Sequence, residues 1–290
     1  MELPCFPRFV PLSLDLQSEM HPALSLTADG VSEFTFSNLY LFRNRYQYKV
    51  CRTPGTFILS GEREGKKFFM TPCAAPAPEV LEELFNTHDY WKGISDSVLG
   101  PNRAALEARG IEFAEDRDNF DYLFLRTDLA GLPGKKLHKK RNLVNAFINS
   151  YRHEERPLSA ALVPHAVAVL DRWREDKGTE GDYAAAREAL EIFGSVKMRG
   201  ALYYVNGRPA GWCLGERLAR GRMFAIHFEK AIDEYRGIYQ FMNQSFAAAL
   251  PRHYTYINRE QDLGDEGLRQ AKMTYRPCGF VKKYLGRMVS

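Results

Sequence analysis

The chain has 290 residues, of which 45% are hydrophobic and 26% charged, a balance typical of a soluble globular protein and unlike that of a disordered chain. Its net charge of +4 is modest, so only a clustering of positive charge would indicate a nucleic-acid ligand. The five cysteines are odd in number and form no CxxC pair, which disfavours a disulfide framework and a cysteine zinc site and favours a reducing cytoplasm.

The N-terminal segment MELPCFPRFVPLSLDLQ has no basic region followed by an apolar one, as a secretion signal would. No window approaches the ~18 apolar residues that a membrane span needs. We therefore expect a cytoplasmic protein with no transmembrane segment. Because a domain usually has roughly 100–200 residues, the length favours two domains, which we place at 1–134 and 135–290.

The first half is predicted to mix helices and strands. Short apolar runs separated by turn residues, such as YKVCRTPGTFILSG and KKFFMTP, predict strands between Phe34 and Met70. The segment PAPEVLEELFNTH predicts a helix with proline in its first turn, and GPNRAALEARG predicts another that ends at Gly110. A strand then leads to a glycine- and proline-marked break at residues 131–134.

The second half opens with the basic segment GKKLHKKRNLVNAF, which predicts a helix with an apolar face and a cationic ridge. A solvated surface is one interpretation of such a charge run; the near absence of Asp and Glu favours the other, an anionic partner such as tRNA or lipid phosphate. The five cations are Lys135, Lys136, Lys139, Lys140 and Arg141.

Two further helices, PHAVAVLDRWRED and DYAAAREALEIF, follow the basic one. Asn206 and Gly207 between two apolar runs then predict a β-hairpin. The remaining order is the strand RMFAIHFEKA, the helix IYQFMNQSFAAAL, the strand YTYIN, the helix GLRQAKMTY and the final strand FVKKYLG.

Residues near these later elements are candidates for chemistry. His227 and Glu229 share one face of a strand and could supply a general base, although such a pair is more often structural. Gly237 begins a helix whose free N–H groups would suit a phosphate; alternatively it only permits a turn. In DNFDYLF, Asp121 and Tyr122 are weaker candidates, with turn capping as the default interpretation.

The stretch YINREQDLGDEGLRQAKMTYRP, residues 256–277, is the most polar of these regions. Capping of the next helix explains Asp265 and Glu266, because carboxylates at a helix N-terminus interact well with its dipole. Capping does not explain four further polar residues at the end of the preceding strand, a position where functional sites in α/β folds are often found. That set is Asn258, Arg259, Glu260 and Asp262, and Arg269 and Lys272 on the helix could pair with these acids or with a phosphate.

At these residues the chain resembles a soluble family of unknown function that shares its catalytic domain with the phosphatidylglycerol lysyltransferases. The matching stretches include FTFSNLYLF, DNFDYLF, GKKLHKKRN, NGRPAGW, FEKA and, above all, residues 256–277, and they span most of the chain from Phe34 onward. The resemblance implies an α+β fold made of two tandem GNAT-like domains, of the kind named for acyl-CoA N-acyltransferases. It also implies an aminoacyl-tRNA donor and places the polar stretch at the mouth of the second domain's cleft.

Two features depart from the resembled proteins. The membrane-spanning part of the lysyltransferases is absent from this sequence, so the acceptor would be a lipid approached from the cytoplasm or a small amine or hydroxyl compound. In YRGIYQ, Ile238 and Tyr239 occupy places where acyl-CoA enzymes need small residues, which puts close approach of a pyrophosphate in doubt.

The leading hypothesis is an aminoacyl or acyl transferase with no tightly bound cofactor or metal, for which aminoacyl-tRNA or acyl-CoA is the co-substrate. The alternatives are an acyl-CoA-dependent N-acyltransferase and a non-catalytic protein that binds tRNA or anionic lipid. The expected catalytic residues are Asn258, Glu260, Asp262, Glu229 and His227. The expected substrate contacts are Lys135, Lys136, Lys139, Lys140, Arg141, Arg259, Arg269, Lys272 and Gly237.

Overall fold

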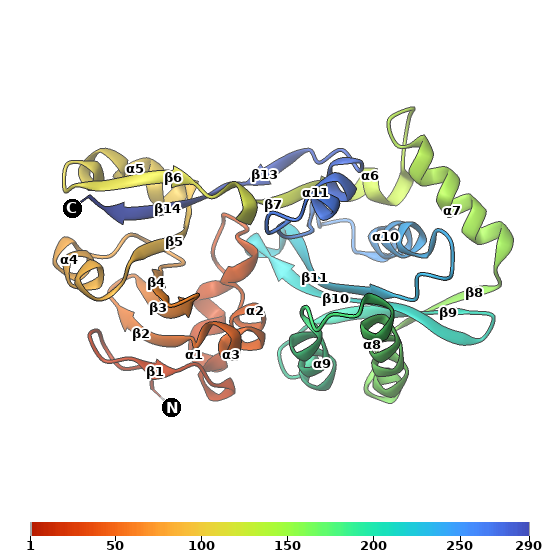
Figure 1. The fold of residues 1–290 in the computed structure, drawn as a ribbon, viewed down its shortest axis with the longest axis horizontal. Coiled ribbons are helices and arrows are strands. Elements are labelled where there is room, and N and C mark those ends of the chain that lie inside the picture. Colours follow the sequence, from red (N-terminus) through yellow and green to blue (C-terminus); the bar gives the residue numbers. More distant parts are fainter. Residues whose placement is uncertain (1, 290) are drawn as a thin grey trace.

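A computed structural model describes residues 2–289 as two seven-stranded mixed sheets with helices packed on them (Figure 1). The sheets lie one after the other along the long axis of the molecule, and β7 and β13 run near the junction between them (Figure 1). The α+β class predicted from the sequence is confirmed.

The first sheet contains β4 and β5 as a parallel pair and is otherwise antiparallel. Its strands in spatial order are β1 (Val10–Pro11), β2 (Lys49–Thr53), β3 (Thr56–Arg63), β4 (Lys66–Met70), β5 (Tyr90–Ser95), β14 (Lys283–Met288) and β6 (Ile111–Glu115). The accompanying helices are α1 (Gln17–Leu24), α2 (Phe36–Leu41), α3 (Arg43–Tyr46), α4 (Pro78–Thr87) and α5 (Asp96–Glu107).

The second sheet has the same arrangement, with β11 and β12 as its parallel pair. Its strands in spatial order are β13 (Gly279–Val281), β7 (Asp121–Leu125), β12 (Tyr256–Asn258), β11 (Met223–Ala231), β10 (Arg208–Leu218), β9 (Arg199–Val205) and β8 (His153–Pro157). Its helices are α6 (Arg126–Gly131), α7 (His138–Ser150), α8 (Val163–Lys177), α9 (Tyr183–Ile192), α10 (Ile238–Ala249) and α11 (Glu266–Met273). Short 3-10 turns occur at Leu14–Leu16, Ser32–Phe34, Arg117–Asn119, Ala160–Leu162 and Ala219–Gly221.

Several local predictions are confirmed. Pro78 lies in the first turn of α4, where its missing N–H costs no hydrogen bond. Asn206 and Gly207 both have positive φ, at 51° and 79°, and join β9 to β10 in an antiparallel hairpin. Helix α5 differs from its prediction because it begins at Asp96 and includes Pro101.

The two sheets exchange strands. The predicted last strand FVKKYLG is two strands: β13 pairs with β7 in the second sheet, and β14 then lies between β5 and β6 in the first. Strand β7, from the first half of the sequence, belongs to the second sheet. The sheets therefore do not divide at residue 134, because an apolar strand pattern does not say which sheet will receive the strand.

The hydrophobic core is continuous across the junction. One cluster contains Leu39 and Phe68 from the first half together with Leu190 and Trp212 from the second, each 0% exposed. Phe42 and Phe228 stack across the same junction with ring centroids 6.5 Å apart. Because burial of these side chains needs both halves, the polar groups at the junction are held in a rigid frame.

Candidate functional site

Asn258 lies at the end of β12 and is fully buried at the junction of the two sheets. Its amide nitrogen donates to the Gly30 carbonyl at 2.8 Å and to Asp121 Oδ2 at 3.1 Å. Its amide oxygen accepts from the Glu260 backbone N–H at 2.7 Å. With each hydrogen-bonding atom engaged inside the protein, Asn258 holds the loop in place, and its catalytic role stays a prediction.

The ion cluster beside Asn258 is centred on Lys283, the first residue of β14. Lys283 Nζ contacts Glu33 and lies 2.8 Å from Asp121 Oδ1, and the side chains of Lys283 and Asp121 are both 0% exposed. Burial alone lowers the pKa of Lys283, but the two carboxylates outweigh it and the pKa is raised. Asp121 is therefore part of a structural ion cluster that ties the C-terminal strand to the junction.

His227 in β11 lies between two carboxylates. Its Nδ1 is 2.7 Å from Glu260 Oε1 and its Nε2 is 3.1 Å from Glu216 Oε1. Burial lowers the pKa of His227, but Glu260 and Glu216 raise it to about 10. The ring is thus an imidazolium at neutral pH that donates from both nitrogens, and neither His227 nor its partner Glu260 is available as the predicted general base.

This raised pKa predicts a pH-dependent contribution to stability. Relative to its usual 6.5, a histidine with a pKa of about 10 stabilises the fold fully below pH 6.5, and the contribution is lost as the pH rises through 10. The stability difference between the wild type and His227→Gln should therefore shrink steadily between pH 6.5 and pH 10. Urea unfolding of both proteins across this range measures it; a difference that does not depend on pH would show that His227 is neutral in the folded state.

Asp262 is fully buried beneath α11 and is bound on several sides. It accepts from Arg269 Nε and Nη2 at 2.9 and 2.8 Å, from the Tyr122 hydroxyl at 2.5 Å and from Arg117 at 3.2 Å. Burial favours the protonated acid, but hydrogen bonds from Arg269, Tyr122 and the Gly264 N–H hold the pKa of Asp262 well below its usual range. Asp262 is thus a carboxylate held ionised by its internal partners, and its catalytic role stays a prediction.

The two predicted anion contacts on α11 are also used internally. Arg269 bridges Asp262 and Asp118, with Nη2 2.6 Å from Asp118 Oδ1. Lys272 Nζ donates to the carbonyls of Arg259 at 2.7 Å and Glu260 at 3.1 Å, and also to that of Gln261. Burial lowers the pKa of Lys272 to about 8, and the neighbouring Arg259 adds to the effect. Both side chains fasten the 259–262 loop and have little freedom to bind a substrate.

Gly237 has a φ of 92° and precedes α10, as a turn glycine would. A Cβ at this position would lie 2.4 Å from the carbonyl oxygen of Leu143 in α7. The close approach of two helix backbones therefore explains this glycine, in agreement with the turn interpretation and without a bound phosphate.

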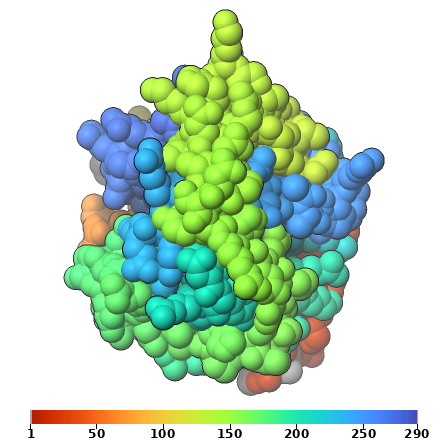
Figure 2. Space-filling view, turned by 90° about the vertical axis from the view of Figure 1, so that its right-hand side faces the viewer, coloured from red at the N-terminus to blue at the C-terminus, as the bar shows by residue number. Residues whose placement is uncertain are grey.

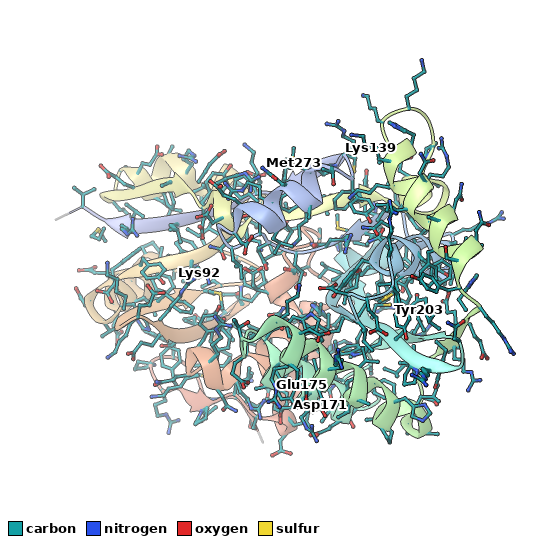
Figure 3. The ribbon with its side chains drawn as sticks, turned by 45° about the vertical axis from the view of Figure 1, so that its right-hand side comes forward. Lys92, Lys139, Asp171, Glu175, Tyr203 and Met273 are labelled. Atoms are coloured by element: carbon teal, nitrogen blue, oxygen red, sulfur yellow. The ribbon has the colours of Figure 1, made fainter. Side chains whose placement is uncertain are left out.

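The basic segment divides into residues with different surroundings. Helix α7 begins at His138, so Lys135 and Lys136 lie in the turn before it, and both are exposed, as is Lys139. Figure 2 shows this turn and α7 as a yellow-green ridge across one face of the molecule, and Lys139 projects from the same end of the helix in Figure 3. Arg141 instead donates to the Leu132 carbonyl at 2.6 Å and closes the preceding turn.

Lys140 differs from the rest of the run because it points inward. Its position, three residues after Leu137 and four before Val144, places it on the helix face that those two buried residues define. Its Nζ lies 4.3 Å from the centre of the Tyr275 ring. Burial lowers the pKa of Lys140, and Arg259 lowers it further. The spacing of Leu137, Lys140 and Val144 in the sequence therefore indicates that Lys140 lies on the apolar face of the helix.

Arg259 and Glu229 complete the cluster that Lys140 reaches. Arg259 Nη2 is 2.9 Å from Glu229 Oε2, and their side chains are 15% and 11% exposed. The amide of Asn243 in α10 faces the same guanidinium, and the Tyr275 ring lies 5.6 Å from it. Sequence reasoning singled out Lys140, Arg259 and Glu229, but nothing in the local pattern indicated Asn243 or Tyr275.

This Lys140–Arg259–Glu229 cluster lies where two parallel strands separate. β11 pairs with β12 only from Met223 to Ala225 and then continues to Ala231 paired with β10 on its other side, while the chain after β12 turns away at Arg259. Glu229 is in the part of β11 that has no β12 neighbour. The divergence of neighbouring strands at their carboxyl ends is where ligands bind in open α/β sheets. The cluster therefore combines two cations, one acid and partial exposure at such a position.

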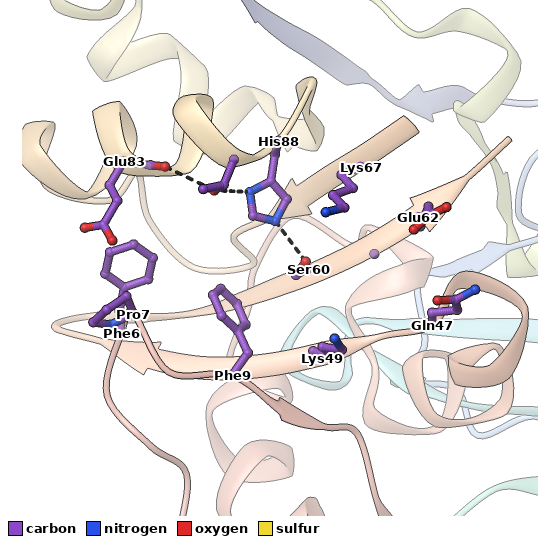
Figure 4. A pocket seen from close by; sticks show the side chains of 12 residues that line it. Phe6, Pro7, Phe9, Gln47, Lys49, Ser60, Glu62, Lys67, Glu83 and His88 are labelled. Carbon is purple, nitrogen blue, oxygen red and sulfur yellow. Dashed lines mark hydrogen bonds between the residues drawn. The ribbon is translucent and has the colours of Figure 1, made fainter. Parts of the chain in front are cut away.

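Two pockets are found elsewhere, in the first half of the molecule. One of about 340 Å³ is lined by Phe6, Phe9, Lys67 and other side chains, and in it His88 Nε2 lies 2.8 Å from Ser60 Oγ (Figure 4). The other, of about 280 Å³, is lined by residues that include Lys92 and Arg287. Neither is lined by a residue predicted from the sequence to belong to the site.

Within residues 2–289, no three His, Cys, Asp or Glu side chains are grouped so as to hold a metal ion. None of the helices in this range combines the length and apolar composition that crossing a bilayer requires.

Comparison with known proteins identifies the fold. A conserved protein of unknown function from Bacteroides thetaiotaomicron superimposes with a TM-score of 0.88 and 29% identity, over 99% of this chain and 100% of that one. The C-terminal domain of a putative lysylphosphatidylglycerol synthetase from Agrobacterium fabrum gives a TM-score of 0.66 and 16% identity, over 96% of this chain and 93% of that one. A tandem GNAT protein from the clavulanic acid biosynthesis pathway gives a TM-score of 0.50 and 12% identity, over 98% of this chain and 99% of that one. The predicted pair of tandem GNAT-like domains is confirmed.

Sequence comparison gives the family. An uncharacterized protein from Mycoplasmoides gallisepticum is 25% identical over 178 residues, and the match spans 58% of this chain and 56% of that relative. The family described as phosphatidylglycerol lysyltransferase, C-terminal, matches residues 25–287, which include the second sheet, all of the first except β1 and the last residue of β14, and the strand exchange between them. The chain therefore belongs to the phosphatidylglycerol lysyltransferase C-terminal family, as its resemblance in sequence implied.

Proposed function

We propose that this protein transfers an aminoacyl group from aminoacyl-tRNA to an amine or hydroxyl acceptor, at the Lys140–Arg259–Glu229 cluster. The observation that supports the proposal most strongly is the convergence of an inward-facing lysine of the basic helix with Arg259 at the diverging strands β11 and β12. Membership of a lysyltransferase family supports the reaction class.

The reaction requires the protein to position the two substrates and to stabilise the charge that develops on the ester carbonyl oxygen. The acceptor nitrogen or oxygen attacks the ester carbonyl, the ester bond to the tRNA ribose breaks, and the acceptor's proton passes to the departing ribose oxygen. Negative charge develops on the carbonyl oxygen during attack, and Arg259 and Lys140 are suited to stabilise it in a partly buried site. Glu229 orients Arg259 through their 2.9 Å ion pair.

The exposed cations at the start of α7 fit the tRNA backbone. Lys135, Lys136 and Lys139 are exposed at the end of the helix that carries Lys140, where they can bind the phosphates of a tRNA. Backbone contacts of this kind release counterions and make binding depend strongly on salt. Such a donor also accords with a cytoplasmic location.

An acyl-CoA donor is favoured less. In that reaction a pyrophosphate would approach the N-terminus of α10, but Gly237 there packs against the Leu143 carbonyl of α7, and the Tyr239 hydroxyl is 3.2 Å from the backbone nitrogen and oxygen of Ala231 at the end of β11. These contacts occupy the space that the cofactor would need.

Label transfer tests the proposal directly. Wild-type protein is incubated with a cell extract and either radioactive aminoacyl-tRNA or radioactive acetyl-CoA, and the lipid, small-molecule and protein fractions are counted. Label from aminoacyl-tRNA alone is expected, and the labelled fraction names the acceptor class. Label from acetyl-CoA alone would establish the N-acyltransferase, and salt-dependent tRNA binding without transfer would establish the binding protein.

Two adjacent lysines provide a matched pair for this assay. Lys140→Met is expected to slow transfer about 10-fold or more because it removes a charge beside the reacting ester. Lys139→Met removes the same charge from an exposed position and should reduce only tRNA affinity and its salt dependence. Equal effects of the two substitutions on the transfer rate at saturating tRNA would remove Lys140 from the site.

A further inference from the structure

The pocket of about 280 Å³ in the first half lies away from the proposed transfer site, and nothing about it depends on that chemistry. It is formed where β3 ends, β4 and β5 begin and β14 ends. Its lining is Arg63, Glu64, Lys66, Tyr90, Lys92, Asp116, Asn119, Leu285 and Arg287. Side chains on neighbouring strands of one sheet therefore surround the pocket.

Lys92 is the buried member of this lining. The residue is 7% exposed, and its Nζ lies 5.2 Å from the ring centres of both Tyr46 and Phe68, while none of the described residues accepts a hydrogen bond from it or pairs with it within 4 Å. Figure 3 labels it inside the first half of the molecule. Burial lowers the pKa of Lys92, although Glu33 and Asp116 at longer range oppose the effect.

The other buried lysines of residues 2–289 each have partners. Lys283 binds Asp121, Lys230 binds Asp182 at 2.6 Å, and Lys272 donates to backbone carbonyls. An unpaired buried ammonium group costs free energy that pairing would recover. Among the buried lysines of residues 2–289, Lys92 alone has only aromatic rings around its ammonium group, and its position at a pocket leaves room for an anionic partner from outside.

The remaining charges around the pocket favour an anion. Arg63 pairs with Glu64 at 3.1 Å, and Asp116 keeps its charge because its two oxygens accept at 2.9 Å from the neutral Asn119 amide, so the lining holds four cations against two carboxylates. Lys66 and Arg287 have no carboxylate partner within residues 2–289, so with Lys92 they leave an excess of positive charge. Three cations from β4, β5 and β14 thus surround one small cavity.

We propose that this pocket binds the phosphate or carboxylate group of a small soluble molecule, with Lys92 as its buried contact and Lys66 and Arg287 at the rim. Leu285 and Tyr90 are the only lining residues with large apolar side chains, so the lining favours a polar ligand over an acyl chain. A pocket of about 280 Å³ is close to the lower end of the range that small-molecule ligands occupy.

Thermal unfolding with Lys92→Met tests the proposal. Inorganic phosphate and glycerol 3-phosphate should each raise the Tm of the wild type by several degrees, since a ligand of the folded state stabilises it. Lys92→Met should have an equal or higher Tm without anion, because an unpaired buried charge is removed, and should lose the anion-dependent rise. Acetate measures carboxylate binding, and vesicles of an anionic phospholipid show whether a headgroup is taken instead of a free molecule.

Lys177→Met is the control, because it removes the same charge from an exposed position in α8 and should retain the full rise. Arg287→Met changes an exposed rim residue and should weaken anion binding several-fold, so the test does not rest on one buried substitution. Phosphate also stabilises proteins non-specifically, and that effect is common to all variants. A Tm rise of equal size in wild type, Lys92→Met and Arg287→Met would overturn the proposal, as would binding to the vesicles alone.

Discussion

Replacement of Lys283 by methionine is expected to lower the free energy of unfolding by about 3–5 kcal/mol, the usual cost of removing one partner from a buried ion pair. The substitution leaves Asp121 and Glu33 with no cation between them, in a place where Lys283 and Asp121 are 0% exposed. Because Lys283 begins β14, the loss also loosens the strand that lies between β5 and β6. Urea unfolding followed by circular dichroism measures the change.

The adjacent Lys282 provides the control. It pairs with Glu115 at 2.6 Å, but both side chains are about half exposed and screened by solvent, so Lys282→Met should change stability far less than Lys283→Met. The double variant Asp121→Asn, Lys283→Met should recover part of the loss because it removes one uncompensated charge. Similar losses for Lys282→Met and Lys283→Met would show that the buried cluster contributes no more than a surface pair.

Replacement of Arg259 by glutamine is expected to reduce kcat/KM for aminoacyl transfer about 10²–10³-fold, the typical effect of removing one group that stabilises a developing oxyanion. Arg259 is only 15% exposed and is held by Glu229, so its charge is positioned before the substrate binds. The decrease should fall on kcat, because the charge on the ester oxygen exists only in the transition state. Single-turnover transfer at saturating aminoacyl-tRNA separates this from binding.

Two further variants distinguish chemistry from structure at this position. Arg259→Lys keeps a positive charge and should recover part of the rate. The double variant Glu229→Gln, Arg259→Gln removes both charges and should restore stability without restoring transfer. If it restored transfer as well, Arg259 would act only as the partner of Glu229, and the proposed oxyanion contact would be wrong.

Local structure was predictable wherever it depends on neighbouring residues. The Asn206-Gly207 turn, the proline-started helix α4 and the capping of α11 by Asp265 follow from backbone preferences and short-range hydrogen bonds. Resemblance in the long stretch 256–277 was enough to indicate the family and its tandem fold. Turns, helix starts, helix caps and motif resemblance each depend on residues that are close together in the chain, so one sequence is enough to predict them.

The roles of the individual polar residues were mostly not predictable. Asn258, Glu260, Asp262, Arg269 and Lys272 were expected to face a cleft, and the structure uses all of them to hold the junction between the sheets. Their partners lie far away in the chain: Asp262 binds Arg117, and Glu260 binds His227. A carboxylate beside an unknown partner can be a base or a structural anion, and only the partner decides which.

By itself, then, the sequence determined most of the order of the elements, the family and the cationic character of the segment at 135–141, because propensity, turn chemistry and motif similarity are local. Only the tertiary structure decided that β14 returns to the first sheet, that Lys140 packs on the Tyr275 ring near Arg259, and that Lys92 is buried with no carboxylate or carbonyl partner among residues 2–289. Each of these depends on contacts between distant parts of the chain, and burial at those contacts sets which charges are neutralised and which remain to act on a ligand.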